Sequence, residues 1–318
     1  MKKTILSGVK PTGRPHIGNY FGAMKQFVAL QNEHQGGYFF IADYHALNLI
    51  QNAKELKELS LDVVMDFLAI GLDPKKSIIF KQSDVSEHTE LAWIFDAITT
   101  LPYLKRAHAY KDAVAKGGEE DVSAGTFTYP MLMAADILLY DTDIVPVGQD
   151  QKQHIEFARD TAEKFNRIFG ETFKLPEAYI LKDVETVPGT DSRKMSKSYN
   201  NTIPLFATDE EIEKAVMSIV TDSSGERPEN VYAIHKLFYK YTIKELDKMY
   251  EEKKGQYKLL KWDLIEDLKK FIKPLREKRE EIAKDLNFVN KVLEEGKEKA
   301  KAVASVKMQA VKKAIGVR

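Results

Sequence analysis

The chain has 318 residues, with 48 Lys and Arg against 48 Asp and Glu, no cysteine, 43% hydrophobic residues and 30% charged residues. This composition excludes a disulfide-stapled mini-protein, a disordered chain and any site built on cysteine, such as a thiolate nucleophile or an iron–sulfur cluster. No run of 18 apolar residues occurs, and the apolar stretch before Lys10 is too short for a signal peptide. We therefore expect a cytoplasmic protein of about two domains, with no membrane segment.

The charges are unevenly distributed. Residues 251–318 carry 19 Lys and Arg against 12 Asp and Glu, and the first 250 residues carry the balancing acidic excess. This asymmetry fits an acidic body with a basic appendage for a polyanion. Helices rich in Lys and Glu on a protein surface produce the same imbalance, so charge alone does not indicate a nucleic acid partner.

The N-terminal two thirds alternates β-rich runs with helical patterns. Strands are predicted over Thr4–Val9, Tyr38–Ala42, Ser77–Lys81 and Asp143–Val147. Helices are predicted between them over Gly18–Gln31, Glu55–Ile70 and Asp150–Phe169. This alternation predicts an α/β fold with a Rossmann-like parallel sheet and helices on both faces, in which ligands bind at the carboxyl ends of the strands.

Beyond residue 205 the sequence is dense in helix formers. Helices are predicted over Asp209–Ile219, Ile234–Tyr241, Ile243–Glu252 and Lys258–Leu286. The segment Val184–Ser198, which contains Pro188, Gly189 and several small polar residues, is predicted to be an exposed loop. We expect an α/β domain over residues 1–203 that ends in this loop, and an all-helical C-terminal domain over residues 204–318.

The first candidate site follows the first strand and opens the first helix, over residues 7–20. Free N–H groups and the helix dipole make such a position an anion site. Gly18 lets a flat base approach the backbone, and His16 and Asn19 lie on one helical face where both can donate to phosphate oxygens. Thr12 and the Pro11–Gly13 backbone complete a phosphate cradle. On spacing alone, a simple strand–loop–helix turn is an equally good interpretation.

The second candidate site is the segment Lys194–Ser198, with the sequence KMSKS. Two lysines and two serines on a loop offer positive charge and hydroxyl donors to a triphosphate. For an arbitrary lysine-rich pentamer, a solvated basic linker is the better interpretation.

The presence of both segments in one chain favours the functional interpretation over a turn and a linker. The sequence His16-Ile17-Gly18-Asn19 and the KMSKS segment about 180 residues later resemble the HIGH and KMSKS signatures of class I aminoacyl-tRNA synthetases, with Asn19 in place of the last histidine. Further blocks extend the resemblance: Ser7-Gly8, Pro11–Gly13, Ile17–Tyr20, Gly22-Ala23, Asp43–Ala46, Tyr129–Leu138 and Val145–His154. These blocks look like the bacterial tryptophanyl-tRNA synthetase family over essentially the whole chain, and asparagine is common there at the position of Asn19.

One of these blocks makes chemical sense as a tryptophan pocket. Tyr129, Met133, Asp136 and Ile137 have helical spacing that places them on one face, an apolar patch with one carboxylate. An indole is a large apolar ring with a single N–H donor, which a buried acceptor selects better than shape alone. Without the resemblance, Asp136 would more often be a satisfied carboxylate in a core helix, Met133 a core methionine and His45 a loop histidine.

The resemblance implies roles for individual residues. The tryptophan site comprises Leu6, His45, Tyr129, Met133, Asp136, Ile137, Val145, Val147 and Gln151, of which Tyr129 and Gln151 hold the ammonium and carboxylate. The ATP site comprises Lys10, Pro11, Thr12, Gly18, Asn19, Gly148, Gln149, Asp150, Val187, Lys194, Met195, Ser196, Lys197 and Ser198. The catalytic set is Thr12, His16, Asn19, Lys194, Ser196 and Lys197. The ATP phosphates and water hold Mg²⁺, with no protein metal site.

The implied activity is the ATP-dependent conversion of L-tryptophan to tryptophanyl-adenylate and pyrophosphate, followed by transfer to tRNA(Trp). The resemblance also implies a homodimer, a helical domain that binds the anticodon and a last helix that packs back on the catalytic domain. Three alternatives remain: a tyrosyl-tRNA synthetase, a catalytically silent paralogue that senses tryptophan or binds RNA, and a small-molecule adenylyltransferase. His45, Met133 and the Gly148–His154 block argue against the first, the intact KMSKS segment against the second, and the long helical domain against the third.

Overall fold

The computed structural model describes residues 3–34, 36–147, 152–180, 187–221, 227–238 and 242–317. Its internal contacts divide the chain into two compact units, and each is described by itself. The sheet unit comprises Met1–Thr12, Phe27–Lys182 and Asp285–Arg318, and the helical unit comprises Gly13–Gln26 and Asp183–Lys284. This division by contacts differs from a single boundary at residue 203, because the segment around the first helix start groups with the later helices and the last helix groups with the sheet.

The sheet unit is built on parallel strands. In the first sheet, β1 (Leu6–Val9), β2 (Tyr38–Ile41) and β3 (Ile78–Lys81) lie in the order β1-β2-β3. The second sheet pairs β4 (Ile144–Val147) with β5 (Glu177–Ile180), and a parallel bridge between Ile5 and Ile144 joins the two sheets. The four predicted strands are confirmed, and β5 is a strand that the sequence patterns did not indicate.

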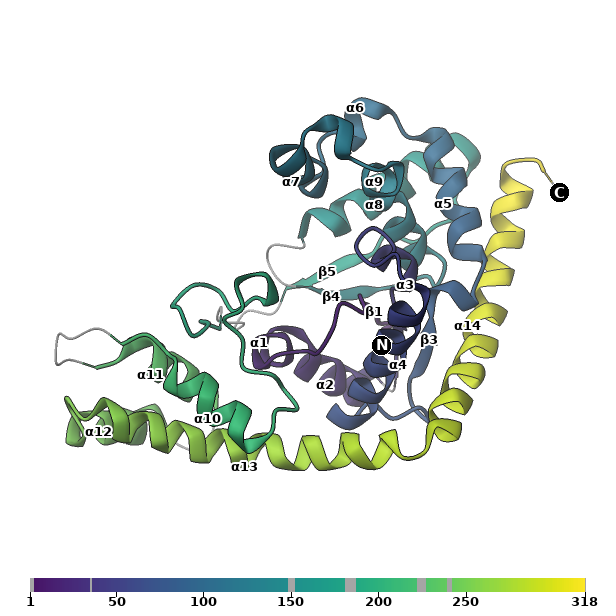
Figure 1. Ribbon diagram of the computed structural model, residues 1–318. Helices are drawn as coiled ribbons and strands as arrows, with labels where there is room; N and C mark the ends of the chain where they lie inside the picture. The colour runs from purple at the N-terminus through teal and green to yellow at the C-terminus, as the bar shows by residue number, and fades with distance from the viewer. Residues whose placement is uncertain are drawn as a thin grey trace. The chain divides into compact units, whose positions relative to one another are not determined.

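Helices cover both faces of these strands (Figure 1). They are α2 (Lys25–His34, which begins in the helical unit), α3 (Asp43–Ala46), α4 (Ala53–Ile70), α5 (Glu87–Ile98), α6 (Leu101–Leu104), α7 (His108–Gly117), α8 (Ala124–Leu138), α9 (Lys152–Phe169) and α14 (Leu286–Ala314). Local signals set their ends. Asn52 accepts a hydrogen bond from the Glu55 N–H at the start of α4, and Gly71, with a φ of 109°, ends that helix in the left-handed conformation. The α/β architecture predicted from the sequence is confirmed.

The last helix, α14, packs on β3 and α5 of the sheet unit. A Cβ atom on Gly296 would lie 1.8 Å from the carbonyl oxygen of Ile79, so the helix and the strand touch backbone to backbone at this point. Further along the helix, Lys307 forms an ion pair with Asp141 (2.6 Å). Lys312 pairs with Glu90 (2.5 Å), and these two basic side chains of the tail are therefore engaged by acids of the sheet unit.

We expect Gly296→Ala to lower the free energy of unfolding by about 1–3 kcal/mol, because α14 must move away from β3 to accommodate the added methyl group. Urea unfolding followed by circular dichroism measures this effect. Lys299→Ala, at an exposed position of the same helix, is the matched control and should change the unfolding free energy by less than about 0.5 kcal/mol. Equal effects of the two substitutions would contradict the close packing.

The helical unit begins with α1 (Ile17–Asn19), which continues into η1, a π-helix over Tyr20–Met24. Its other elements are η5, a 3₁₀ turn over Lys197–Tyr199, and the helices α10 (Asp209–Met217), α11 (Glu229–His235), α12 (Ile243–Glu252) and α13 (Tyr257–Ala283). Thr208 and Thr242 start α10 and α12 with capping boxes, in which each threonine and the glutamate three residues later bond reciprocally.

One helix of this unit differs from its prediction. The sequence pattern indicated a helix over Ile234–Tyr241, whereas α11 runs from Glu229 to His235, directly after Pro228. Pro228 is the N-cap residue just before the first turn, where its missing N–H removes no hydrogen bond of the helix. Residues 239–241 lie outside the described part of the chain. No helix among the described residues is long and apolar enough to cross a membrane.

Candidate active site

His16 and Asn19 form a reciprocal cap at the start of α1. The Asn19 N–H donates to His16 Nδ1 (3.2 Å), and the His16 N–H donates to Asn19 Oδ1 (3.1 Å). The two side chains are therefore brought together, as their spacing predicted, but each uses one polar atom on the backbone of the other. His16 Nε2 and the Asn19 amide nitrogen are the atoms that remain to donate to a ligand.

His16 is a neutral imidazole at neutral pH. Its side chain is buried, and burial together with the nearby positive charge of Lys197 lowers the pKa of His16 to about 4. Because Nδ1 accepts the Asn19 N–H, the geometry assigns the proton of the neutral ring to Nε2. His16 thus offers one fixed N–H donor and carries no charge of its own.

The KMSKS segment contacts the first signature within the helical unit. Lys197 Nζ donates to the carbonyl oxygen of Gly13 (2.7 Å). The chain just beyond it pairs with the same segment, since the Ile17 N–H donates to Ile203 O (3.0 Å) and the Leu205 N–H donates to Pro15 O (2.9 Å). Two motifs that are distant in sequence thus become neighbours.

Close packing at Gly18 also depends on this arrangement. A Cβ atom on Gly18 would lie 2.8 Å from His16 Nδ1 and 3.4 Å from the Cβ of Met195. Met195 is buried, and its backbone N–H donates to Val187 O (2.9 Å), whereas Lys194, Lys197 and Ser198 are exposed. Within KMSKS, the methionine is therefore a packing residue and the polar side chains face outward.

A second constellation, in the sheet unit, surrounds the buried carboxylate of Asp136 on α8. Oδ1 accepts hydrogen bonds from His88 Nδ1 (2.6 Å) and Gln82 Nε2 (2.8 Å), and Oδ2 accepts from His45 Nε2 (2.9 Å) and again from Gln82 Nε2 (2.9 Å). Burial acts to raise the pKa of Asp136, but the hydrogen bonds from His45 and His88 outweigh it and hold the pKa well below its ordinary value. Asp136 is therefore an anion with an organised shell.

No sequence motif indicated His88 and Gln82 as site residues. They follow β3, in the turn η2 (Gln82–Asp84) and the first turn of α5, and both are fully buried. A polar residue after a parallel strand is the only signal that pointed to them, and many solvated residues share it. Tyr140 completes the shell, because its hydroxyl lies 2.8 Å from His88 Nε2.

The other residues predicted for the tryptophan site lie around this cluster or in the core. The Tyr129 hydroxyl lies 3.1 Å from His154 Nδ1, and the ring of Tyr129 lies 6.2 Å from that of His45. Lys10 Nζ lies 5.8 Å from the centroid of the Tyr129 ring. Leu6, Ile137 and Val145 belong to the buried core, and the partly buried Met133 and Val147 pack against it. Four predicted site residues, Gly148, Gln149, Asp150 and Gln151, lie outside the described residues.

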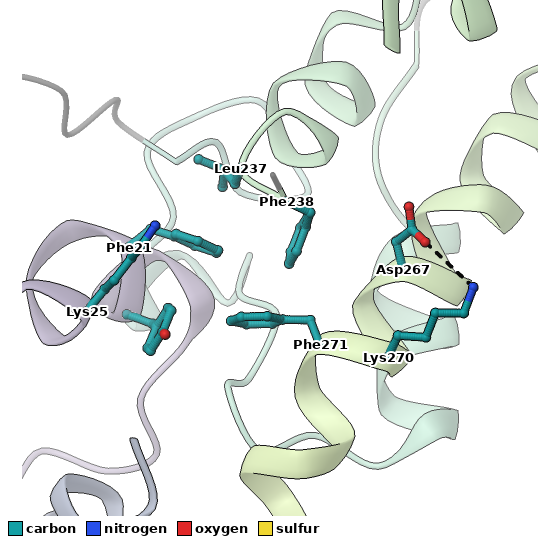
Figure 2. A pocket seen from close by; sticks show the side chains of 8 residues that line it. Phe21, Lys25, Leu237, Phe238, Asp267, Lys270 and Phe271 are labelled. Carbon is teal, nitrogen blue, oxygen red and sulfur yellow. Dashed lines mark ion pairs between the residues drawn. The ribbon is translucent and has the colours of Figure 1, made fainter. Parts of the chain in front are cut away.

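The helical unit also contains a cavity of about 380 Å³ beside the π-helix (Figure 2). Tyr20 and Phe21, the two residues after Asn19, pack against Phe271 of α13 with ring centroids 5.4 and 5.6 Å apart, and Phe238 lies at a similar distance. The remaining lining side chains are Lys25, Leu237, Asp267 and Lys270. These aromatic contacts anchor the helix that carries the first signature to α13.

A parallel sheet covered by helices, together with paired HIGN and KMSKS segments, indicates a class I aminoacyl-tRNA synthetase. The family model described as "tRNA synthetases class I (W and Y)" matches residues 2–309, and the chain belongs to this family. It is 50% identical to the tryptophan–tRNA ligase of Fusobacterium nucleatum, over 99% of this chain and 98% of the relative.

Solved structures agree with this assignment. The tryptophanyl-tRNA synthetase of Campylobacter jejuni, complexed with ADP and tryptophan, matches with a TM-score of 0.90 and 45% identity over 98% of this chain and 99% of that chain. The enzyme from Mycoplasma pneumoniae matches with a TM-score of 0.84 and 31% identity over 99% of this chain and 98% of that chain.

We expect the free energy of unfolding to fall by about 2 kcal/mol between pH 7 and pH 5 through His16 alone. The unfolded chain binds a proton on this histidine below its ordinary pKa of 6.5, whereas the folded chain does so only near pH 4, so acid favours unfolding. Urea unfolding of the wild type and of His16→Asn, which keeps a capping oxygen, measures this contribution. The same pH dependence in both proteins would contradict the lowered pKa.

Proposed function

We propose that the protein is a tryptophan–tRNA ligase. The tryptophan carboxylate attacks the α-phosphorus of ATP to give tryptophanyl-adenylate and pyrophosphate, and a terminal ribose hydroxyl of tRNA(Trp) then takes the aminoacyl group. The contact between Lys197 and the Gly13 carbonyl carries this proposal, because it joins the KMSKS segment to the loop that leads into HIGN, in a family whose relatives match almost the whole chain. The Campylobacter jejuni structure, which is complexed with ADP and tryptophan, supports a nucleotide and tryptophan as the ligands here.

The first step needs no covalent enzyme intermediate, so catalysis consists of positioning and charge stabilisation. In the proposal, Lys194, Ser196 and Lys197 bind the pyrophosphate as negative charge develops on it. The His16 Nε2–H and the Asn19 amide donate to phosphate oxygens, together with Thr12. Because His16 is neutral, it donates without adding charge, and the lysines supply the electrostatic part.

The remaining nucleotide contacts are assigned by resemblance. They involve Lys10, Pro11, Gly18, Val187, Met195 and Ser198, together with Gly148, Gln149 and Asp150. Mg²⁺ enters with ATP as part of the substrate. By resemblance, phosphate oxygens and water coordinate this ion.

For the amino acid, the proposal places the indole among Met133, Val147 and their neighbours, with its N–H toward Asp136. Asp136 is anionic and three side chains fix its position, and in the proposal the indole N–H takes the place of one of the two hydrogen bonds that the carboxylate accepts from Gln82 Nε2. His45 Nδ1 is also buried, and it has no hydrogen-bond partner among the described residues. A polar ligand group at this position would satisfy it, which supports a ligand beside Tyr129.

The tRNA and the oligomeric state complete the proposal. Residues 204–318 correspond to the domain that, by resemblance, reads the anticodon, and we propose a cytoplasmic location, as expected of an enzyme that acts on tRNA. We also propose a homodimer, from the resemblance alone.

The direct test is ATP–pyrophosphate exchange with each of the twenty amino acids in the absence of tRNA. We expect exchange with tryptophan, because a fixed anionic acceptor rewards the indole N–H and leaves a cost for rings without one. Tyrosine as the preferred substrate would instead indicate a tyrosyl-tRNA synthetase. Folded protein that binds tryptophan but exchanges with no amino acid would favour the sensor hypothesis.

Substitutions in the KMSKS segment and in the Asp136 cluster should change different kinetic parameters. We expect Lys197→Ala to lower kcat of the exchange reaction about 100-fold with little change in the KM for tryptophan, since it acts on developing charge. Asp136→Ala should instead raise the KM for tryptophan about 10- to 100-fold, because it removes the acceptor. Lys214→Ala, an exposed lysine on α10, is the control for loss of positive charge. Comparable losses of kcat alone for Lys197→Ala and Asp136→Ala would contradict this division.

A further inference from the structure

Asn201, three residues beyond KMSKS, is almost fully buried, with 2% of its surface exposed. Its Oδ1 accepts the N–H of Ser196 (2.7 Å), and its Nδ2 donates to the carbonyl oxygen of Lys194 (3.2 Å). The backbone carbonyl of Asn201 also accepts the N–H of Thr190 (3.0 Å). One side-chain amide therefore binds the KMSKS backbone on both sides of Met195.

Asp191 fixes the orientation of this amide. Asn201 Nδ2 donates to Asp191 Oδ1 (2.6 Å), and the guanidinium of Arg193 bonds the other carboxylate oxygen through Nε (2.7 Å). The hydrogen bond from Asn201 lowers the pKa of Asp191, and Arg193 adds to this effect, so the carboxylate is ionised. An ionised acceptor requires the NH₂ group of Asn201 to face Asp191, which leaves Oδ1 for the Ser196 N–H.

The surroundings leave little freedom for another arrangement. A Cβ atom on Gly189 would lie 2.2 Å from Asn201 Nδ2 and 2.7 Å from its backbone oxygen, so the opposing strand of the loop packs directly on the amide. The Gly189 N–H donates to Arg193 O (2.7 Å), which closes the turn that carries Asp191. The side-chain amide of Asn201 supplies the one acceptor and the two N–H donors that its three partners require in this buried space.

We propose that Asn201 is a positioning residue for the first reaction step. It holds the backbone of Lys194 and Ser196 so that the polar side chains of KMSKS are presented together to the pyrophosphate. This inference rests on the proposed function and adds to it a residue that contacts no substrate. Positional errors of about 1 Å in such groups can cost about 100-fold in rate.

The test is Asn201→Asp, which keeps the size and the acceptor for the Ser196 N–H but sets a carboxylate against Asp191 and the Lys194 carbonyl. In ATP–pyrophosphate exchange, we expect kcat to fall about 10- to 100-fold, with the KM for tryptophan changed less than about twofold. The Asp136 cluster should be unaffected. Asn200→Gly, at the exposed neighbouring position where φ is 52°, is the matched control and should retain wild-type kcat.

A compensating substitution separates positioning from a loss of folding. The double variant Asp191→Asn with Asn201→Asp exchanges the amide and the carboxylate, which restores the hydrogen bond between the two side chains but not the donor to the Lys194 carbonyl, so we expect it to recover part of the lost kcat. Unchanged kcat in Asn201→Asp, an equal rise in the KM for tryptophan, or no recovery in the double variant would overturn the inference. Absence of exchange in the wild type would instead contradict the proposed function, so the two failures are distinguishable.

Discussion

The structure of the candidate active site depends on a short run of backbone hydrogen bonds in the helical unit. Residues 15–17 and 203–205 pair with each other, and the KMSKS loop is thereby held next to the helix start that carries His16. Backbone N–H and C=O groups away from water need hydrogen-bond partners. This pairing therefore satisfies the backbone of the fold and also positions the residues of the site. The Lys197 contact with Gly13 follows from it.

The charged groups have different environments in the KMSKS–His16 region and in the Asp136 cluster. In the helical unit, positive charge from the KMSKS lysines is exposed, and the neighbouring His16 is kept neutral by burial and by Lys197. In the sheet unit, the negative charge of Asp136 is buried and balanced by hydrogen bonds from His45, His88 and Gln82. An enzyme that binds a polyanion and an apolar ring needs this combination, with exposed cations for the first and a fixed acceptor for the second.

Sequence patterns predicted four of the parallel strands and the helices α2, α4, α9, α10, α12 and α13, because each of these elements has a local signal, but they gave no range for α3, α5, α6, α7 or α14. They missed β5, whose four residues begin with Glu177 and contain only a short apolar run. They also displaced α11, which begins directly after Pro228 and ahead of the predicted range. Both errors occurred where the local signal was short or divided, so that contacts distant in sequence decided the outcome.

The sequence by itself determined the α/β class, the two signature segments and the family, since these depend on residue types in a fixed order. Only the tertiary structure decided that His88 and Gln82 share Asp136, that His16 is neutral, and that Asn201 binds the KMSKS backbone. Each of these features arises where residues from separate elements meet inside the protein. There, desolvation makes every polar atom require a partner, and a linear sequence does not show which partner it finds.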